Sequence, residues 1–272
     1  MTPSKPAIRF KILRDTMRNL LLRILGSLAP LIHSDTGTMD RWLWVRRRLP
    51  ITRNGERLLD VGCGTGAFSI NADKRGYTCL GLTWDEPATA VATERARICK
   101  ADKTSFRVVD VRQLDQQTDL IGGFDVVLCC ENIEHILDDR KLMADMFAAL
   151  KPGGRLVLTT PWHDYDPITL PDAGPFLQEE TGWHVRRGYT KCMLEELCIK
   201  TGFAVEEIDY NVGWLSQKTI FIFQKLKFIL PLAWLVILPL RPIVHLFDRP
   251  LTRFFGRKFF SICLVAYRPR FR

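Results

Sequence analysis

The chain has 272 residues, 47% of them hydrophobic and 25% charged, which is enough to bury the core of one large domain with extensions. Its eight cysteines lie mostly in apolar runs without the paired short spacing of a zinc site, so we expect reduced thiols and no bound metal. Five basic residues interrupt the apolar N-terminal region, which argues against a signal peptide and for a cytoplasmic protein.

The net charge of +9 is unevenly divided along the chain. Residues 1–57 carry 12 Lys and Arg against 4 Asp and Glu, residues 58–211 carry 16 against 25, and residues 212–272 carry 11 against 1. The acidic centre suits a cationic ligand, and the two basic ends suit an anionic partner.

The first 56 residues are predicted to form a basic, amphipathic helical extension. Residues 8–32 place leucines and isoleucines among the basic side chains at helical spacing, and a second short helix is predicted over 38–48. From residue 57 onward, short apolar strands alternate with helical stretches, which is typical of βα units and a parallel sheet. The predicted strands are 57–61, 79–82, 106–109, 125–130, 155–160 and 204–210, and the predicted helices are 66–75, 86–99, 138–149 and 190–201.

A final strand over 261–267 closes the predicted sheet, and an apolar, helical insertion over 219–247 precedes it. Its centre, residues 228–240, holds 13 uncharged positions. This run is well short of the roughly 20 residues that span a bilayer. Three interpretations remain open: the insertion lies in a membrane interface, covers a pocket as an apolar lid, or packs as core.

A glycine-rich turn follows the first predicted strand, in the order Leu58-Leu59-Asp60-Val61-Gly62-Cys63-Gly64-Thr65-Gly66. Glycine allows a ligand to approach the backbone closely, and the N-terminus of the next helix offers N–H groups to a carboxylate. The third glycine comes two residues after the second, and an acidic residue precedes the turn, unlike the usual dinucleotide-binding pattern.

This turn resembles motif I of class I methyltransferases that depend on S-adenosylmethionine (SAM), and the resemblance extends over residues 57–161. Segment 106–111 is similar to the family's third strand, segment 124–135 to its fourth strand and following loop, and segment 150–155 to the turn before its fifth strand. The resemblance implies an α/β fold: a Rossmann-like, seven-stranded, mostly parallel sheet with helices on both faces. It also implies SAM as the cofactor, held by Asp60, Gly62, Cys63, Gly64, Gly66, Asp110, Val111 and Glu131.

Within this resemblance, Asp110 would bind the adenine amine, the backbone N–H of Val111 the adenine ring, and Glu131 would lie near the methionine part of SAM. The second strand departs from the family, because it ends in Gly81-Leu82-Thr83 where a carboxylate usually receives the ribose hydroxyls. Either Asp85 replaces that carboxylate or it caps the following helix. The Gly-x-Thr ending also resembles cyclopropane fatty-acid synthases, whose substrates are lipids.

Candidate catalytic residues follow the fourth and fifth strands, where open α/β sheets bind ligands. We expect His135 and His184 to line the acceptor pocket, with Glu131 beside them. Glu131 and His135 could instead only cap or orient the loop. Methyl transfer is an in-line displacement, and a general base is needed only for an acceptor such as a hydroxyl. Arg186 and Arg187 suit an anionic substrate or form an exposed pair.

The predicted function is methyl transfer to a lipid, a lipid-linked glycan or another small molecule, at an anionic membrane surface on the inner, cytoplasmic face. The basic ends and the apolar insertion favour this function. Basic ends would also suit RNA, but long aliphatic runs suit contact with lipid better than contact with RNA phosphates. The alternatives are a soluble metabolite, an RNA acceptor, or a SAM-binding module without activity. The sequence indicates no oligomeric state.

Overall fold

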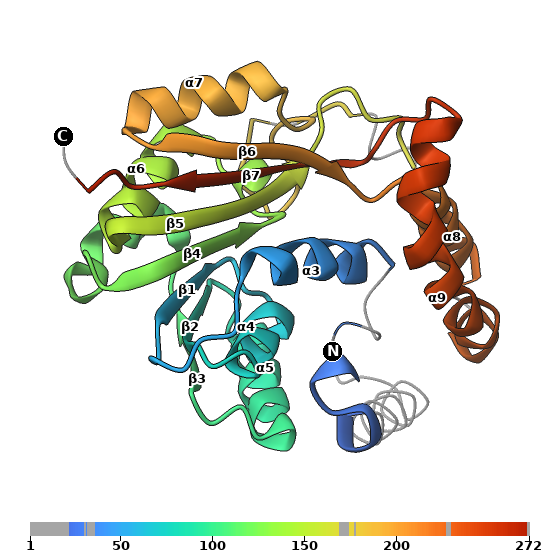
Figure 1. Ribbon diagram of the computed structural model, residues 1–272, viewed down its shortest axis with the longest axis horizontal. Helices are drawn as coiled ribbons and strands as arrows, with labels where there is room; N and C mark the ends of the chain where they lie inside the picture. The colour runs from blue at the N-terminus through green and yellow to red at the C-terminus, as the bar shows by residue number, and fades with distance from the viewer. Residues whose placement is uncertain are drawn as a thin grey trace, which may run out of the picture.

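The computed structural model describes residues 22–29, 31, 36–168, 174–176, 178–226 and 230–270, with only the backbone for 230–238. Much of the predicted N-terminal helix, and the junction at 227–229, therefore lie outside the described residues. The described part is built around one seven-stranded sheet with helices packed on both of its faces (Figure 1).

All seven predicted strands are confirmed, and their order across the sheet is β3-β2-β1-β4-β5-β7-β6. Strands β1 to β5 pair in parallel, whereas β7 pairs antiparallel with both β5 and β6. The last strand therefore does not form an edge, because it enters between β5 and β6. The strands are β1 Arg57–Val61, β2 Thr78–Thr83, β3 Thr104–Val108, β4 Phe124–Cys130, β5 Leu150–Pro161, β6 Ala204–Asn211 and β7 Ser261–Tyr267.

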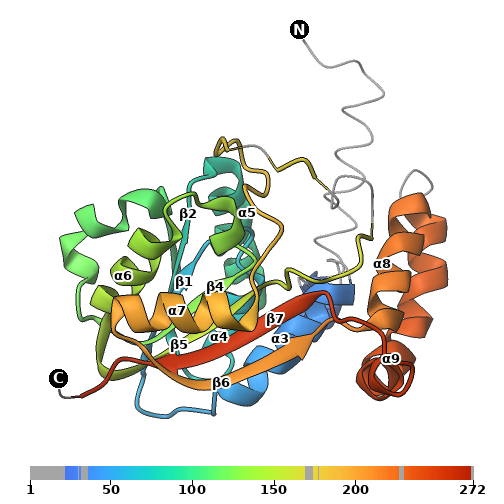
Figure 2. The same cartoon turned by 90° about the horizontal axis from the view of Figure 1, so that it is seen from above.

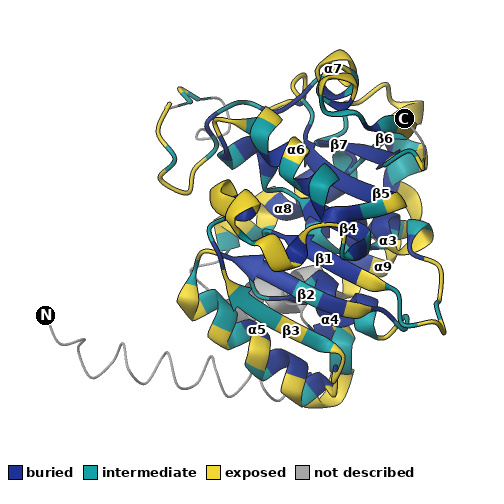
Figure 3. Cartoon of the chain, turned by 90° about the vertical axis from the view of Figure 1, so that its left-hand side faces the viewer, coloured by how far each residue is buried: buried dark blue, intermediate teal, exposed yellow. Residues whose placement is uncertain are grey.

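The central strands are buried on both faces, which explains their nearly continuous apolar sequence. In β4, Val127 and Cys129 pack in one cluster with residues of α6 and α7, whereas Val126 and Leu128 pack in another with residues of α3 and α4. The burial colouring of Figure 3 shows these strands as the interior of the fold. The helices are α3 Thr36–Arg48, α4 Ala67–Asp73, α5 Glu86–Cys99, α6 Asp139–Ala149 and α7 Lys191–Thr201, with 3-10 turns η1 Gly26–Leu28, η2 Val111–Gln116, η3 Thr118–Leu120 and η4 Ile133–His135.

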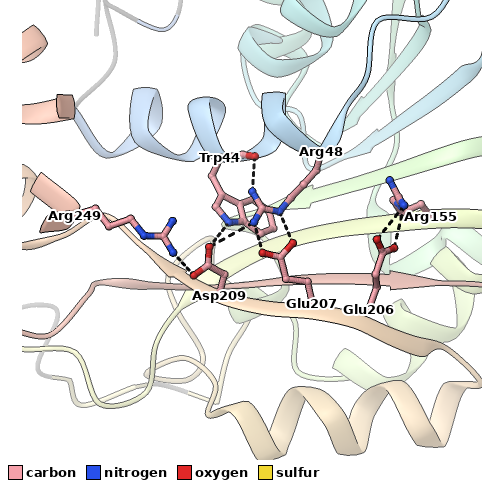
Figure 4. A network of polar contacts seen from close by, with 7 residues as sticks. All are labelled: Trp44, Arg48, Arg155, Glu206, Glu207, Asp209 and Arg249. Carbon is pink, nitrogen blue, oxygen red and sulfur yellow. Dashed lines mark hydrogen bonds and ion pairs between the residues drawn. The ribbon is translucent and has the colours of Figure 1, made fainter. Parts of the chain in front are cut away.

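Helix α3 belongs to the core although it falls within the predicted N-terminal extension. The Trp44 indole donates to Asp209 of β6 at 3.0 Å, and the Arg48 guanidinium donates to Glu207 at 2.9 Å (Figure 4). Arg249 of helix α9, Leu230–Phe254, also pairs with Asp209. This polar network therefore joins the first described long helix to a late strand and to the last helix.

The predicted apolar insertion is helical and longer than expected, with α8 spanning Trp214–Leu226 and α9 spanning Leu230–Phe254. The two helices pack against each other and connect the end of β6 to the start of β7, so they lie beyond the carboxyl ends of the parallel strands (Figures 1 and 2). Ser216 and His245 both hydrogen-bond to Asp40, which fastens this helix pair to α3. Among the described helices, none is long and apolar enough to cross a membrane.

Candidate functional site

A cavity of about 430 Å³ opens at the carboxyl ends of β1, β2 and β4. Its wall combines residues of the glycine turn, of the ends of β2 and β3, and of the loop after β4. A second, smaller cavity of about 180 Å³ shares Gly62 and Glu131 with it. The larger cavity is lined by Gly62, Gly64, Thr83, Trp84, Asp85, Ala88, Asp110, Val111, Arg112, Glu131, Asn132, His135, Ile136, Glu180, Thr181 and Gly182.

The three glycines of the turn have different structural roles, although each has a positive φ. A Cβ on Gly64 would meet nothing within 4 Å, so its backbone faces open space in the cavity. A Cβ on Gly62 would lie 2.4 Å from the Asn132 side chain, and one on Gly66 would lie 2.6 Å from the Phe106 ring. Gly66 lines neither cavity and allows close packing.

The smaller cavity contains the side chains at the start of the turn. Asp60, Cys63 and Arg41 of α3 line it together with Glu131. Burial raises the pKa of Asp60 to about 6, and the hydrogen bond from the Ser69 hydroxyl at 2.6 Å opposes that rise. Burial also raises the pKa of the Cys63 thiol, so this side chain is no thiolate nucleophile.

The end of β2 presents Thr83 and Asp85 to the larger cavity. Thr83 is buried, and its hydroxyl accepts a hydrogen bond from the Asp85 backbone N–H at 3.4 Å. Asp85 occupies the N-cap position of α5, but its side chain makes no capping hydrogen bond. Its carboxylate is therefore not used by the helix end and borders the cavity instead.

Asp110 and Val111 line the wall at the end of β3. The Arg112 guanidinium donates to both Asp110 carboxylate oxygens, at 2.8 and 2.9 Å from Nε, and lowers the pKa of Asp110. Arg112 also pairs with Glu180 at 2.7 Å, and Glu180 accepts from the Leu137 backbone N–H at 2.6 Å. The sequence did not indicate this bridge, which ties the wall at the end of β3 to the loop before α7.

Glu131 lies between the two cavities in a backbone conformation that is rare outside glycine, with φ +50°. Its carboxylate accepts from Thr159 at 3.1 Å and Ser261 at 3.3 Å, and it faces Arg41 at 3.5 Å. Strained backbone of this kind persists where surrounding contacts enforce it, and it is concentrated at functional sites.

His135 lines the larger cavity, whereas His184 does not. The two rings are in edge-to-face contact, with centroids 4.7 Å apart, and both face Glu134. Burial and the nearby Glu131 charge raise the pKa of Glu134 well above its ordinary value. The sequence analysis missed Glu134; the only available signal was its position beside His135 and three residues after Glu131.

Arg186 and Arg187 line neither of the two cavities, and both are partly buried rather than exposed. Arg186 donates to the carbonyls of Ile136 and Leu137 at 2.7 and 2.9 Å, and Arg187 donates to the Tyr165 carbonyl at 2.9 Å. Both guanidinium groups therefore hold the loop before α7 in place.

Comparison with known proteins identifies the family of this chain. The family described as "Methyltransferase domain" matches residues 38–208, which is more than half of the chain. A ubiquinone biosynthesis O-methyltransferase of Acinetobacter baumannii is 32% identical over 106 residues, covering 39% of this chain and 44% of that protein. The chain thus matches less than half the length of this curated relative.

Solved structures show the same fold. Phosphoethanolamine N-methyltransferase 2 of Haemonchus contortus, in complex with phosphomonomethylethanolamine and S-adenosylhomocysteine, is 19% identical with a TM-score of 0.60, covering 84% of this chain and 52% of that one. A SAM-dependent methyltransferase of Mesorhizobium loti is 21% identical with a TM-score of 0.54, covering 84% and 97%. The chain therefore belongs to the methyltransferase domain family and has the fold of the class I SAM-dependent methyltransferases.

Proposed function

We propose that this chain binds SAM in the larger cavity and transfers its methyl group to the hydroxyl of a small, amphiphilic acceptor at an anionic membrane surface. The observation that carries the proposal is that three of the matched motif segments, the glycine turn, the end of β3 and the loop after β4, converge on one cavity together with the end of β2. When bound, SAM supplies an electrophilic methyl group on a sulfonium. The acidic middle of the chain favours such a cationic ligand.

The residues present fit this cofactor. Gly64 leaves bare backbone at the cavity wall, where a side chain would occupy ligand space. We assign the ribose hydroxyls to Asp85 with Thr83, and the adenine to Asp110 and the backbone of Val111. Asp60 and Cys63 belong to the smaller cavity, on the side assigned to the methionine part.

A hydroxyl acceptor is supported by the name of the related O-methyltransferases. Such an acceptor must lose a proton during methyl transfer. His135 lines the larger cavity, and Glu131 lines both the larger and the smaller cavity. We assign these two residues to the acceptor side. His184 would act through His135, because it contacts that ring and lines neither cavity.

Membrane docking is supported by an apolar stripe on α9. We define the α9 stripe as the exposed residues Leu240, Ile243, Leu246, Phe247 and Phe254, whose spacing puts them on one side of the helix. The same helix pair and the residues directly after it carry exposed basic side chains: Lys218, Lys225, Arg253, Arg257 and Lys258.

An apolar stripe on a helix pair that also carries exposed cations suits the interface of an anionic bilayer. The excess of basic residues in 1–57 lies almost entirely in the predicted extension 1–56, ahead of the methyltransferase domain 57–272, and would add to this attraction. Such binding is peripheral and reversible, and we place it on the cytoplasmic face. The Gly81-Leu82-Thr83 ending, with its resemblance to cyclopropane fatty-acid synthases, also supports a lipid-like acceptor.

The function is tested by incubating the chain with methyl-labelled SAM and separated lipid, glycan, RNA and metabolite extracts. We expect label in the lipid fraction, in a hydroxyl-bearing species, and none with Asp110→Ala. Removing that partly exposed carboxylate should weaken SAM binding by about 1–3 kcal/mol. Label confined to water-soluble metabolites or to RNA would reject the membrane acceptor, and SAM binding without labelling of any fraction would indicate a binding module.

A further inference from the structure

Three potential metal ligands converge beside the larger cavity, from two segments about 50 residues apart in the sequence. Glu134 and His135 belong to η4, and His184 belongs to the loop before α7. Their ligand atoms all lie within 4.8 Å of one another. The Glu134 Oε1 atom is 3.9 Å from His135 Nε2 and 4.0 Å from His184 Nε2.

These distances are too long for hydrogen bonds and suit a common ion. Zinc and similar ions bind nitrogen and oxygen at about 2.0–2.2 Å, which separates the ligand atoms of one ion by roughly 3 to 4.4 Å. The two glutamate–histidine distances already lie in that range, and no pair of ligand atoms is more than 4.8 Å apart.

The buried carboxylate of Glu134 is an independent sign that something binds there. This side chain is fully buried, and its Oε2 atom accepts a hydrogen bond from the Thr160 hydroxyl at 3.0 Å. The Oε1 atom, which faces both histidines, has no hydrogen-bond partner among the residues that the structure describes. Buried carboxylate oxygens are rarely left in this state, because their desolvation is costly unless a partner or an ion compensates it.

The rest of the fold holds the two segments together. The Val185 backbone N–H donates to the Glu134 carbonyl at 3.0 Å, directly after His184. The Tyr189 hydroxyl donates to Asp139 at 2.8 Å, and Arg186 donates to the Ile136 carbonyl at 2.7 Å. The three side chains are therefore brought together by contacts that do not themselves involve the cluster.

We propose that Glu134, His135 and His184 bind a divalent transition-metal ion, and that this ion takes an oxygen atom of the acceptor as a further ligand. Two imidazoles and one carboxylate suit ions such as Zn²⁺, Mn²⁺, Fe²⁺ or Co²⁺ and leave coordination positions for other ligands. Because His135 also lines the larger cavity, an oxygen-bearing acceptor there lies next to the ion. Only this second part rests on the proposed function; ion binding stands on the cluster alone.

The test is a titration of the full chain, freed of any affinity tag and stripped with a chelator, with Zn²⁺ by calorimetry and with Co²⁺ by visible absorption. We expect one saturable site, and a rise in melting temperature with metal. Glu134→Gln and His184→Ala should each weaken binding by about tenfold or more, and should lose the metal-dependent rise. The matched control is His163→Ala, since His163 is a half-exposed histidine paired with Asp164 outside the cluster, and it should bind like the wild type.

Glu134→Gln keeps an oxygen that can accept from Thr160, so we expect it to fold, and circular dichroism checks this. No saturable binding to the wild type, or equal affinity in wild type and Glu134→Gln, would overturn the ion site. S-adenosylhomocysteine is titrated into the same samples, and its affinity should not change in the metal-site variants. If S-adenosylhomocysteine does not bind the wild type, the proposed function is rejected. The ion site is decided by the metal titration alone.

Discussion

The substitution Gly64→Ala tests whether Gly64 contacts the ligand, because a glycine needed only for its backbone conformation would lose stability without losing ligand affinity. Gly64 has φ +51°, and an added Cβ would meet no protein atom within 4 Å. The left-handed conformation costs a non-glycine residue about 1–2 kcal/mol, and for a chain of this size each kcal/mol lowers the melting temperature by roughly 2–4 °C. We expect that loss of stability, together with a fall of about tenfold or more in affinity for S-adenosylhomocysteine, because the methyl group enters ligand space.

The matched control is Gly122→Ala. Gly122 has φ +59°, an added Cβ there would also meet nothing within 4 Å, and it lines neither cavity. It should therefore lose similar stability and keep its ligand affinity, measured by calorimetry beside thermal unfolding. Gly62→Ala should be less stable than both, since its Cβ would lie 2.4 Å from Asn132. Equal ligand affinity in folded Gly64→Ala and Gly122→Ala would refute the assignment of the turn to the cofactor.

The remaining predictions concern the ribose, pH and the membrane. Asp85→Asn should weaken S-adenosylhomocysteine binding by about 1–3 kcal/mol without lowering stability, because the side chain makes no capping bond; unchanged affinity in calorimetry would remove the ribose role. Asp60 has a pKa raised from 3.8 to about 6, so its contribution to the free energy of unfolding is present below pH 4 and is lost as pH rises through 6. The free energy of unfolding of the wild type, measured with denaturant, should fall by roughly 3 kcal/mol as pH rises across this window, and Asp60→Asn should lack this fall. Parallel pH profiles of the two proteins would contradict the prediction. Leu246→Asp with Phe247→Asp should reduce sedimentation with anionic vesicles at low salt, whereas Ile199→Asp, an exposed apolar residue on α7, should not; equal sedimentation of all three proteins would reject the α9 stripe as the docking surface.

Local patterns in the sequence were sufficient to predict the elements of the sheet and the cofactor turn. Strands buried on both faces must be almost continuously apolar, and helices between them must carry polar residues, so their positions follow from short windows. The turn at Gly62 and Gly64 was recognisable for a similar reason, because its glycines satisfy a local backbone requirement. Helix α5 and strand β7 have the predicted bounds.

The tertiary structure alone decided which distant groups share a site. Arg112, which pairs locally with Asp110, also pairs with the distant Glu180, and Glu134 meets His184. No local pattern links Arg112 to Glu180 or Glu134 to His184. The same holds for α3, whose Trp44 donates to Asp209 and so joins the core. Local sequence governs backbone conformation over a few residues, whereas the partner of a charged or aromatic side chain depends on how the sheet and its connections bring separate segments together.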